Sequence, residues 1–287
     1  MGELDGRAAI VTGGSRGLGQ AIAGALLDAG ASVLIAAREA ARVEAAAAEL
    51  RPRAAAGRSL LAVAADVSTR EGCERIMEAA GPLLPELDVL VCNAGVFGAV
   101  GLMEETDWDE WLQAVQVNLV GTVLMCRAVV PLLRRRGHGK IVCLSGGGAT
   151  TPLPHFSAYA ASKAAVVRFA ETLAHELRDD HVDVNAMAPG LLRTRLLDDV
   201  LAAGPERVGA EFHARMRREA EAGATPLEKG AALAVFLASP RSDGITGRLL
   251  SAVWDDWAAL EGQKDALAGS DLYTLRRVTP PPAEGPR

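Results

Sequence analysis

Runs of apolar and β-branched residues recur along the chain, separated by segments in which apolar positions follow helical spacing. Most runs are apolar at consecutive rather than alternating positions, as burial on both faces of a parallel sheet requires. This alternation of strand and helix predicts an α/β fold, a doubly wound parallel sheet of seven strands flanked by helices in a single domain. The predicted strands are 8–12, 32–37, 60–65, 87–92, 140–145, 182–187 and 248–253. The predicted helices include 17–29, 39–56, 107–135 and 156–178.

Two regions depart from this alternation. Residues 191–226 form a long excursion before the last helix, interrupted by Gly204 and Pro205, and we expect them to form a helical lid over a ligand. The main domain is therefore expected over residues 1–254. Residues 255–287 form a C-terminal extension, and its Pro-rich end is predicted to be disordered.

Length and composition limit the functions open to the chain. Its 287 residues, 49% of them apolar, suffice for the core of one large domain. The formal net charge of −6 argues against a nucleic-acid partner, because phosphate backbones bind basic surfaces. The acidic N-terminal segment does not fit a secretion signal, and the apolar segment 118–133 is short for a bilayer and contains Arg127. We therefore expect a cytoplasmic protein with no membrane partner.

The four cysteines are scattered along the chain without the CxxC spacing of common metal sites. They lie mainly in apolar segments, so we expect buried thiols in a reducing compartment, with neither a metal nor a disulfide. These residues are Cys73, Cys92, Cys126 and Cys143.

A glycine-rich stretch, IVTGGSRGLGQ, follows the first predicted strand and leads into the first predicted helix. Glycines at positions 13, 17 and 19 allow a tight turn, a close approach of backbone amides to a pyrophosphate, and close packing of helix on sheet. Because both the strand and the helix flank the glycines, the stretch predicts a nucleotide-binding loop.

The glycine spacing is TGxxxGxG, and further motifs follow it in order. They are Asp66 in ADVS, CNAG at 92–95, Asn118 in VNLVG, Tyr159 with Lys163, and APGLLRT at 188–194. In these motifs the chain resembles the short-chain dehydrogenase/reductase family from residue 7 to about residue 250. The resemblance implies a Rossmann-like fold and an NAD(P)-dependent enzyme acting on the CH–OH group of a small-molecule substrate. It also implies a homodimer or homotetramer paired through helices 107–135 and 156–178.

The second predicted strand ends in Ala37 and Arg38, without the carboxylate that would bind a free ribose 2′-hydroxyl. Arg38 and Arg16 offer two guanidinium groups to a 2′-phosphate, which favours NADP(H) and leaves NAD(H) possible. The resemblance implies that Asp66 and Val67 contact adenine, that Asn93 and Gly95 line the ribose, and that Thr194 holds the carboxamide. The full predicted cofactor set is Gly13, Ser15, Arg16, Gly17, Leu18, Gly19, Arg38, Asp66, Val67, Asn93, Ala94, Gly95, Tyr159, Lys163, Pro189 and Thr194.

Tyr159 and Lys163 lie four residues apart, on one face of the predicted helix 156–178. The ammonium of Lys163 is expected to lower the pKa of the Tyr159 phenol and make it a proton shuttle between substrate and solvent. The resemblance implies a further member, Asn118, whose backbone carbonyl holds a water linked to the lysine. Together with Ser145, these residues form the predicted catalytic set.

The family usually presents a serine hydroxyl thirteen residues before the tyrosine, and this chain has Gly146 there. Ser145 is one residue early, so its side chain should point to the opposite face of the strand. The glycines at 146–148 could instead turn Ser145 round toward the substrate. Otherwise the donor comes from water, the substrate or a neighbour, and the candidate neighbours are Thr150, Thr151, His155 and Ser157.

These residues favour an NADP(H)-dependent oxidoreductase that interconverts a secondary alcohol and a ketone. Two alternatives stay open: a redox-neutral epimerase or dehydratase that holds NAD(P) tightly, and a nucleotide-sensing or scaffold protein with a weakened site. The arginines and Glu211 of 191–226 fit either a polar or acidic ligand or an ordinary solvated helix. Trp254 and Trp257 replace a glycine-rich ending usual in the family, and we expect them to pack at a domain or subunit surface or to form a pocket wall.

Overall fold

The computed structural model describes residues 2–192, 195–223 and 225–278, and it places one parallel sheet at the centre of the molecule. Its strand order is β3-β2-β1-β4-β5-β6-β7. All seven predicted strands are present, each end within two residues of its expected position. The strands are β1 (Ala8–Thr12), β2 (Ser32–Ala37), β3 (Leu60–Ala64), β4 (Leu87–Cys92), β5 (Gly139–Leu144), β6 (Val182–Ala188) and β7 (Leu249–Ser251).

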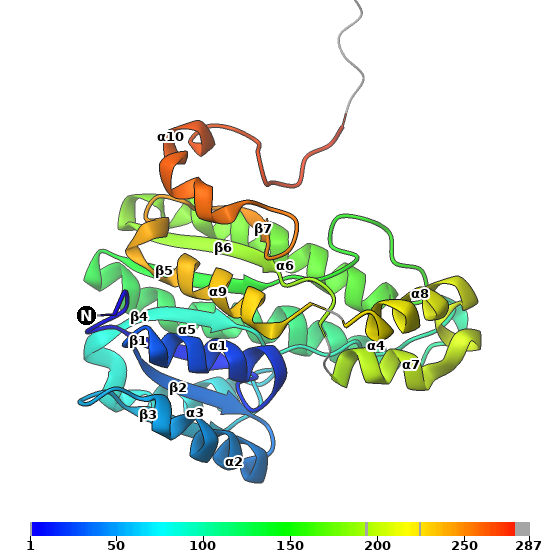
Figure 1. Cartoon of the computed structure of the whole chain (residues 1–287), viewed down its shortest axis with the longest axis horizontal. Coiled ribbons are helices and arrows are strands. Elements are labelled where there is room, and N and C mark those ends of the chain that lie inside the picture. Colours follow the sequence, from blue (N-terminus) through cyan, green and yellow to red (C-terminus); the bar gives the residue numbers. More distant parts are fainter. Residues whose placement is uncertain (1, 193–194, 224, 279–287) are drawn as a thin grey trace, which may run out of the picture.

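Helices cover both faces of this sheet (Figure 1). One layer consists of α1 (Gly17–Asp28), α2 (Ala40–Leu50) and α9 (Leu227–Ala238). The other consists of α3 (Arg70–Ala79), α5 (Gly121–Arg136) and α6 (Ser157–Glu176). Successive strand residues supply the two cores in turn: Val89 and Val91 pack toward the first layer, and Leu90 toward the second. This burial on both faces explains the unbroken apolar runs, and the predicted doubly wound fold is confirmed.

The predicted helix 107–135 is a continuous helical stretch, Trp108–Arg136, with a π-helical turn inside it. The stretch comprises α4 (Trp108–Val115), the π turn Gln116–Val120, and α5. This stretch is long and apolar enough to cross a bilayer by length and composition alone. The expectation that the helix is too short, which considered only 118–133, is therefore wrong. Its inner side packs in the second core through Met125, Val129 and Leu133, as a core helix of a globular domain does.

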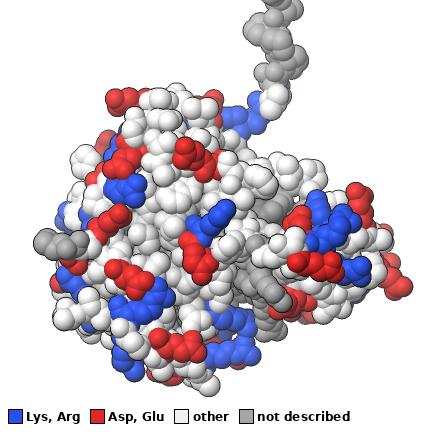
Figure 2. All heavy atoms as spheres, viewed as in Figure 1, with Lys and Arg blue, Asp and Glu red and all other residues white. Residues whose placement is uncertain are grey.

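The region expected to be a lid folds into α7 (Arg195–Val208), which is broken at Gly204, and α8 (Ala210–Glu221). These helices project from one end of the sheet (Figure 1). Their apolar residues pack against Phe156 and Tyr159 in a third, smaller core. The charged residues of α8 pair along its outer side, Arg215 with Glu219 and Arg217 with Glu221, and charges of both signs mingle on this projection (Figure 2).

The C-terminal extension follows the outer edge of β7 and ends its described part at residue 278. The amide of Leu249 donates to the carbonyl of Tyr273 at 2.7 Å, and the Arg248 guanidinium donates to the carbonyls of Ser270, Leu272 and Leu267. The extension includes a 3₁₀ turn, Trp257–Gly262, and α10 (Lys264–Leu267). Trp257 packs on Phe236 and Trp254 is 85% exposed. The Pro-rich end predicted to be disordered, 279–287, lies outside the described residues.

Candidate active site

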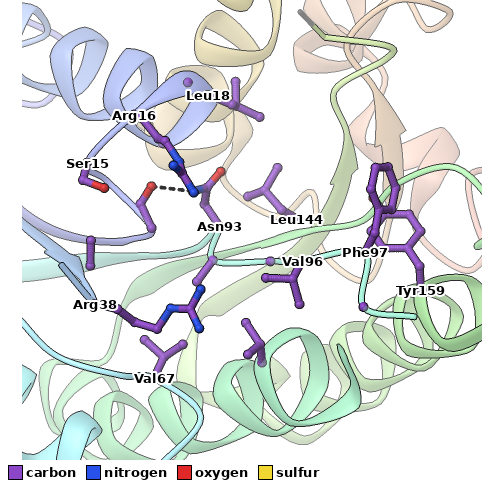
Figure 3. Close-up of a pocket in the computed structure, with 18 of the residues that line it drawn as sticks. Ser15, Arg16, Leu18, Arg38, Val67, Asn93, Val96, Phe97, Leu144 and Tyr159 are labelled. Atoms are coloured by element: carbon purple, nitrogen blue, oxygen red, sulfur yellow. Dashed lines mark hydrogen bonds between the residues drawn. The ribbon is translucent and has the colours of Figure 1, made fainter. Parts of the chain in front are cut away.

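Thr12 and Asn93 join the ends of two neighbouring strands at the carboxyl edge of the sheet. The Thr12 hydroxyl accepts hydrogen bonds from the amides of Asn93 (3.0 Å) and Ala94 (3.1 Å). The Asn93 side-chain amide donates to the carbonyls of Thr12 (2.9 Å) and Gly13 (3.2 Å), the second of these within the cleft of Figure 3. The glycine loop after β1 and the NAG segment after β4 are therefore held as one unit. Thr12 was absent from the predicted set, although the TG of the motif contains it.

The start of α1 lies against this unit at a distance that only glycine permits. A Cβ on Gly19 would lie 2.3 Å from the Gly13 carbonyl oxygen and 2.4 Å from the Asn93 side-chain nitrogen. With no side chain there, the helix N-terminus faces the cleft and its amides point toward any phosphate that enters. The geometry fits the pyrophosphate of a dinucleotide.

A single cleft of about 830 Å³ runs from the glycine loop to Tyr159. Every predicted cofactor residue borders it except Thr194, which lies outside the described residues. Arg16 and Arg38 extend toward the same end of the cleft, while Tyr159 lies at the other end (Figure 3). Glu39 also borders the end with the arginines, and its carboxylate pairs with Arg42 at 2.9 Å.

Tyr159 and Lys163 lie side by side on α6, and both are buried. The Lys163 ammonium is 5.8 Å from the centre of the Tyr159 ring and donates a hydrogen bond of 2.7 Å to the carbonyl of Leu144, at the end of β5. Phe97 covers the tyrosine ring edge-on, with ring centres 4.7 Å apart. The four-residue spacing thus brings phenol and ammonium together, and the strand end fixes the lysine.

Burial raises the pKa of Tyr159 to about 12 and lowers the pKa of Lys163 to about 8, the latter against an opposing effect of the Cys143 and Cys92 thiols. The sequence prediction of a lowered tyrosine pKa is therefore wrong for the protein without cofactor. The pKa is raised because Phe97 and the apolar residues of α7 and α8 cover the phenol and keep water from it. The tyrosine accordingly carries its proton at neutral pH and is ready to donate it.

Asn118 lies in the π turn and braces α6 against the loop after β4. Its side-chain amide donates to the Val96 carbonyl and the Ser162 hydroxyl, both at 2.9 Å, and its side-chain oxygen accepts from the Val96 amide at 2.8 Å. Ser162 in turn donates to the Tyr159 carbonyl at 2.8 Å. The Asn118 backbone carbonyl, which the resemblance assigns to a bridging water, accepts from the Thr122 hydroxyl. Ser162 was not predicted, although it directly precedes Lys163.

The Tyr159 hydroxyl lies directly against the backbone of Gly146. A Cβ at position 146 would be 2.1 Å from the hydroxyl oxygen, so in this arrangement the phenol fills the space that a serine there would need. Ser145 borders the cleft, but its hydroxyl oxygen is buried and has no hydrogen-bond partner in the described part of the chain. It does not present an accessible donor to the cleft in this structure.

The four neighbours considered as replacement donors do not border the cleft as the structure describes it. The Ser157 hydroxyl accepts from the Trp111 indole at 3.0 Å, and Thr150 and Thr151 are exposed. The His155 ring approaches Gly209 of the lid. Two of the predicted sources of the missing hydrogen-bond donor, a water molecule and the substrate itself, do not require any of these four side chains.

Three of the four cysteines meet behind the active site. The sulfurs of Cys92, Cys126 and Cys143 all lie within 4.8 Å of one another, and all three residues are buried. They come from β4, α5 and β5, so no spacing in the sequence indicates that they meet. Cys73 is separate, and burial raises the pKa of its thiol to about 11.

The sheet is doubly wound, a glycine loop precedes α1, and a buried tyrosine–lysine pair lies at the far end of the same cleft. These features together define a class of nucleotide-dependent oxidoreductases. The short chain dehydrogenase family model matches residues 7–203. The chain belongs to this family, whose members are NAD(P)-dependent enzymes, and the predicted family is confirmed.

Known relatives of the chain carry several different names. A rhamnolipids biosynthesis 3-oxoacyl-[acyl-carrier-protein] reductase of Pseudomonas aeruginosa is 34% identical over 86% of this chain and 94% of its own. 3beta-hydroxysteroid dehydrogenase 1 of Eggerthella lenta is 35% identical over 86% and 92%. Among solved structures, L-sorbose reductase of Gluconobacter frateurii, complexed with NADPH and L-sorbose, matches with a TM-score of 0.74 at 29% identity, covering 86% of this chain and 95% of that one.

Proposed function

We propose that the protein is an NADP(H)-dependent oxidoreductase that interconverts a secondary alcohol and a ketone. The observation that carries the proposal is the continuous cleft with a dinucleotide cradle at one end and the buried pair of Tyr159 and Lys163 at the other. The cradle suits such a cofactor because Gly19 leaves the helix amides open to a pyrophosphate. When bound, the nicotinamide supplies or accepts a hydride.

The chain itself contributes proton transfer and positioning. In the direction of reduction, Tyr159 donates its phenolic proton to the substrate carbonyl oxygen, and its high pKa keeps that proton in place at neutral pH. Lys163, held by the Leu144 carbonyl, places a positive charge beside the phenolate that results. Asn118 and Ser162 keep α6 in register with the loop after β4. Ser145 could assist only after its side chain turns toward the cleft.

The preference for NADP(H) rests on Arg16 and Arg38, which border the adenosine end of the cleft. NAD(H) remains the alternative, since Glu39 lies at the same end and a carboxylate can bind a ribose 2′-hydroxyl. Its pairing with Arg42 favours the phosphate-binding role of the arginines. Loss of a charged hydrogen bond worth about 1.5–3 kcal/mol predicts that Arg38→Ala lowers kcat/KM for NADPH about ten- to a hundredfold.

Steady-state kinetics with both cofactors test this preference. Arg38→Ala should leave kcat/KM for NADH nearly unchanged. Arg51→Ala is the matched control, because Arg51 is exposed and does not border the cleft, and it should change neither value. A wild-type preference for NADH would overturn the NADP(H) assignment. Normal NADPH binding without oxidation by any ketone would instead favour the nucleotide-sensing alternative, and nicotinamide that cannot be exchanged would favour redox-neutral chemistry.

We propose further that the chain forms a homodimer or homotetramer. Apolar side chains are exposed around the start of α4: Met103 by 53%, Trp108 by 60% and Leu112 by 38%. Trp108 also stacks on Trp111, with ring centres 5.4 Å apart. Several large apolar side chains exposed within ten residues of one another are typical of a subunit contact. Light scattering should give the mass of a dimer or tetramer, and Trp108→Glu should shift it toward the monomer; a wild-type monomer would refute the proposal.

A further inference from the structure

The part of the cleft nearest Tyr159 has a buried apolar wall and a polar rim. Seven apolar side chains line the cleft here, and they come from the loop after β4, the π turn, β5 and residues 191–226. They are Val96, Phe97, Val100, Val117, Leu144, Leu192 and Val200. Of these, Val200 and Val117 are almost fully buried. Among the polar side chains of the cleft, Glu110, Gln113 and Asp198 are exposed, whereas Ser145 and Lys163 beside Tyr159 are buried.

Phe97 connects the catalytic tyrosine to this wall. Its ring packs on Tyr159 at 4.7 Å and on Phe156 at 5.2 Å, while the ring of Phe156 packs on Phe212 of the lid at 5.1 Å. Phe97 is only half-buried and also borders the cleft, so one part of the ring supports the tyrosine and another part meets the ligand space (Figure 3). An apolar ligand group placed there would replace water on an aromatic surface.

The charges of the lid helix α8 do not contribute to this wall. Arg215 and Arg217 are 53% and 70% exposed at their side chains and pair with glutamates of the same helix. From the described part of 191–226, the cleft receives Leu192, Val200 and the exposed acidic residues at the start of α7. Arg207 of α7 donates to the Val100 carbonyl at 3.2 Å, but its side chain is exposed and does not border the cleft. The arginines of α8 therefore offer no argument for an acidic ligand.

We propose that the substrate is a ketone, or the corresponding alcohol, with a bulky apolar group beside its reacting carbon, held between Phe97 and Val200. This inference rests on the proposed oxidoreductase function and adds the class of substrate. A buried apolar wall stabilises an aromatic or alkyl group by removing it from water. An anionic group there would lose its hydration and lie in a cleft that the carboxylates of Glu110 and Asp198 also border. Phe97 is the residue that determines this specificity.

A panel of uncharged and charged ketones tests the proposal with NADPH as the cofactor. For straight-chain methyl ketones, starting from butanone, kcat/KM should rise about three- to fourfold for each added methylene until the wall is covered. Acetophenone should be reduced at least about tenfold more efficiently than its para-carboxylate. Phe97→Ala should flatten the dependence on chain length, because it should lower kcat/KM for the longest ketone by a larger factor than for butanone.

Two variants separate specificity from structural damage. Phe97→Leu keeps an apolar contact and should retain most of the dependence on chain length. Leu102→Ala lies on the same loop, is exposed and does not border the cleft, so it should leave the dependence unchanged. If Phe97→Ala lowers kcat/KM for butanone by the same factor as for the longer ketones, Phe97 only supports Tyr159. That result would overturn the role of Phe97 in specificity.

The failure of this inference differs from the failure of the proposed function. Efficient NADPH oxidation with no dependence on chain length, or with the carboxylate preferred, would refute the apolar substrate class and leave the oxidoreductase standing. Absence of turnover for the whole panel, with NADPH bound normally, would remove the proposed function and the substrate class with it.

Discussion

Replacing Gly146 by Ser introduces the residue that the family usually carries there, and the structure predicts that it will impair the enzyme. The new Cβ would lie 2.1 Å from the Tyr159 hydroxyl oxygen and 3.0 Å from the ring carbon that bears it. Since carbon–oxygen contacts below 3.0 Å do not occur at real Cβ atoms, the hydroxyl must retreat by about 0.9 Å. A displacement of about 1 Å in a catalytic group can cost about a hundredfold in rate.

The expected result is a kcat for ketone reduction about a hundredfold below wild type. Overpacking should also lower the free energy of unfolding by about 1–3 kcal/mol. Gly146→Ala carries the same Cβ without the hydroxyl and is the matched control. Single-turnover oxidation of NADPH measures the chemical step, and thermal unfolding measures stability.

The two variants at position 146 distinguish a steric displacement of the Tyr159 hydroxyl from the effect of a new hydrogen-bond donor at that position. Equal losses in Gly146→Ser and Gly146→Ala would support the close contact with Tyr159. A serine variant as active as wild type, beside a weak alanine variant, would mean that a hydroxyl at 146 offsets the displacement. Full activity in both variants would refute the placement of the phenol against this backbone.

Three further predictions follow from buried groups. Because the pKa of Lys163 is lowered to about 8 in the folded protein, the unfolded chain binds more protons between pH 8 and about 10.5, and this site adds stability as pH rises. In urea unfolding, the free energy of unfolding of the wild type should therefore rise by on the order of 3 kcal/mol relative to that of Lys163→Met across this pH range. A difference between the two proteins that stays constant with pH would contradict this. Arg248→Ala should release the C-terminal extension and lower the free energy of unfolding by about 2–3 kcal/mol. It should also speed tryptic cleavage at sites beyond residue 255, whereas Arg217→Ala should change neither property. Equal rates of cleavage in the two variants would contradict the anchoring role of Arg248. All four cysteines should resist a thiol reagent until urea unfolds the chain, and rapid native labelling of any of them would show an exposure that the structure lacks.

The fold could be predicted because the central strands β1, β4 and β5 are buried on both faces. The unbroken apolar runs, such as the one at 87–92, follow from that burial, and the flanking helices from their spacing. The break at Gly204 and the excursion at 191–226 also follow from local composition. The π turn around Asn118 could not be predicted, because it depends on side-chain contacts with Val96 and Ser162 from other elements.

The motifs predicted which residues border the cleft, but the electrostatics of the cleft did not follow from them. The sequence places an ammonium one helical turn from the Tyr159 phenol, yet burial by Phe97 and the lid has the larger effect on the tyrosine pKa. That cover comes from segments distant in sequence. The proximity of Cys92, Cys126 and Cys143 could not be predicted either, because three elements distant in sequence supply these cysteines.

The central claim is that Tyr159 donates the proton that completes ketone reduction, and one measurement tests it most directly. Single-turnover absorbance at the nicotinamide band, with NADPH and an apolar ketone, compares wild type with Tyr159→Phe. The account predicts hydride transfer about a thousandfold slower in the variant, with NADPH affinity unchanged. Transfer in Tyr159→Phe within about threefold of wild type would contradict it.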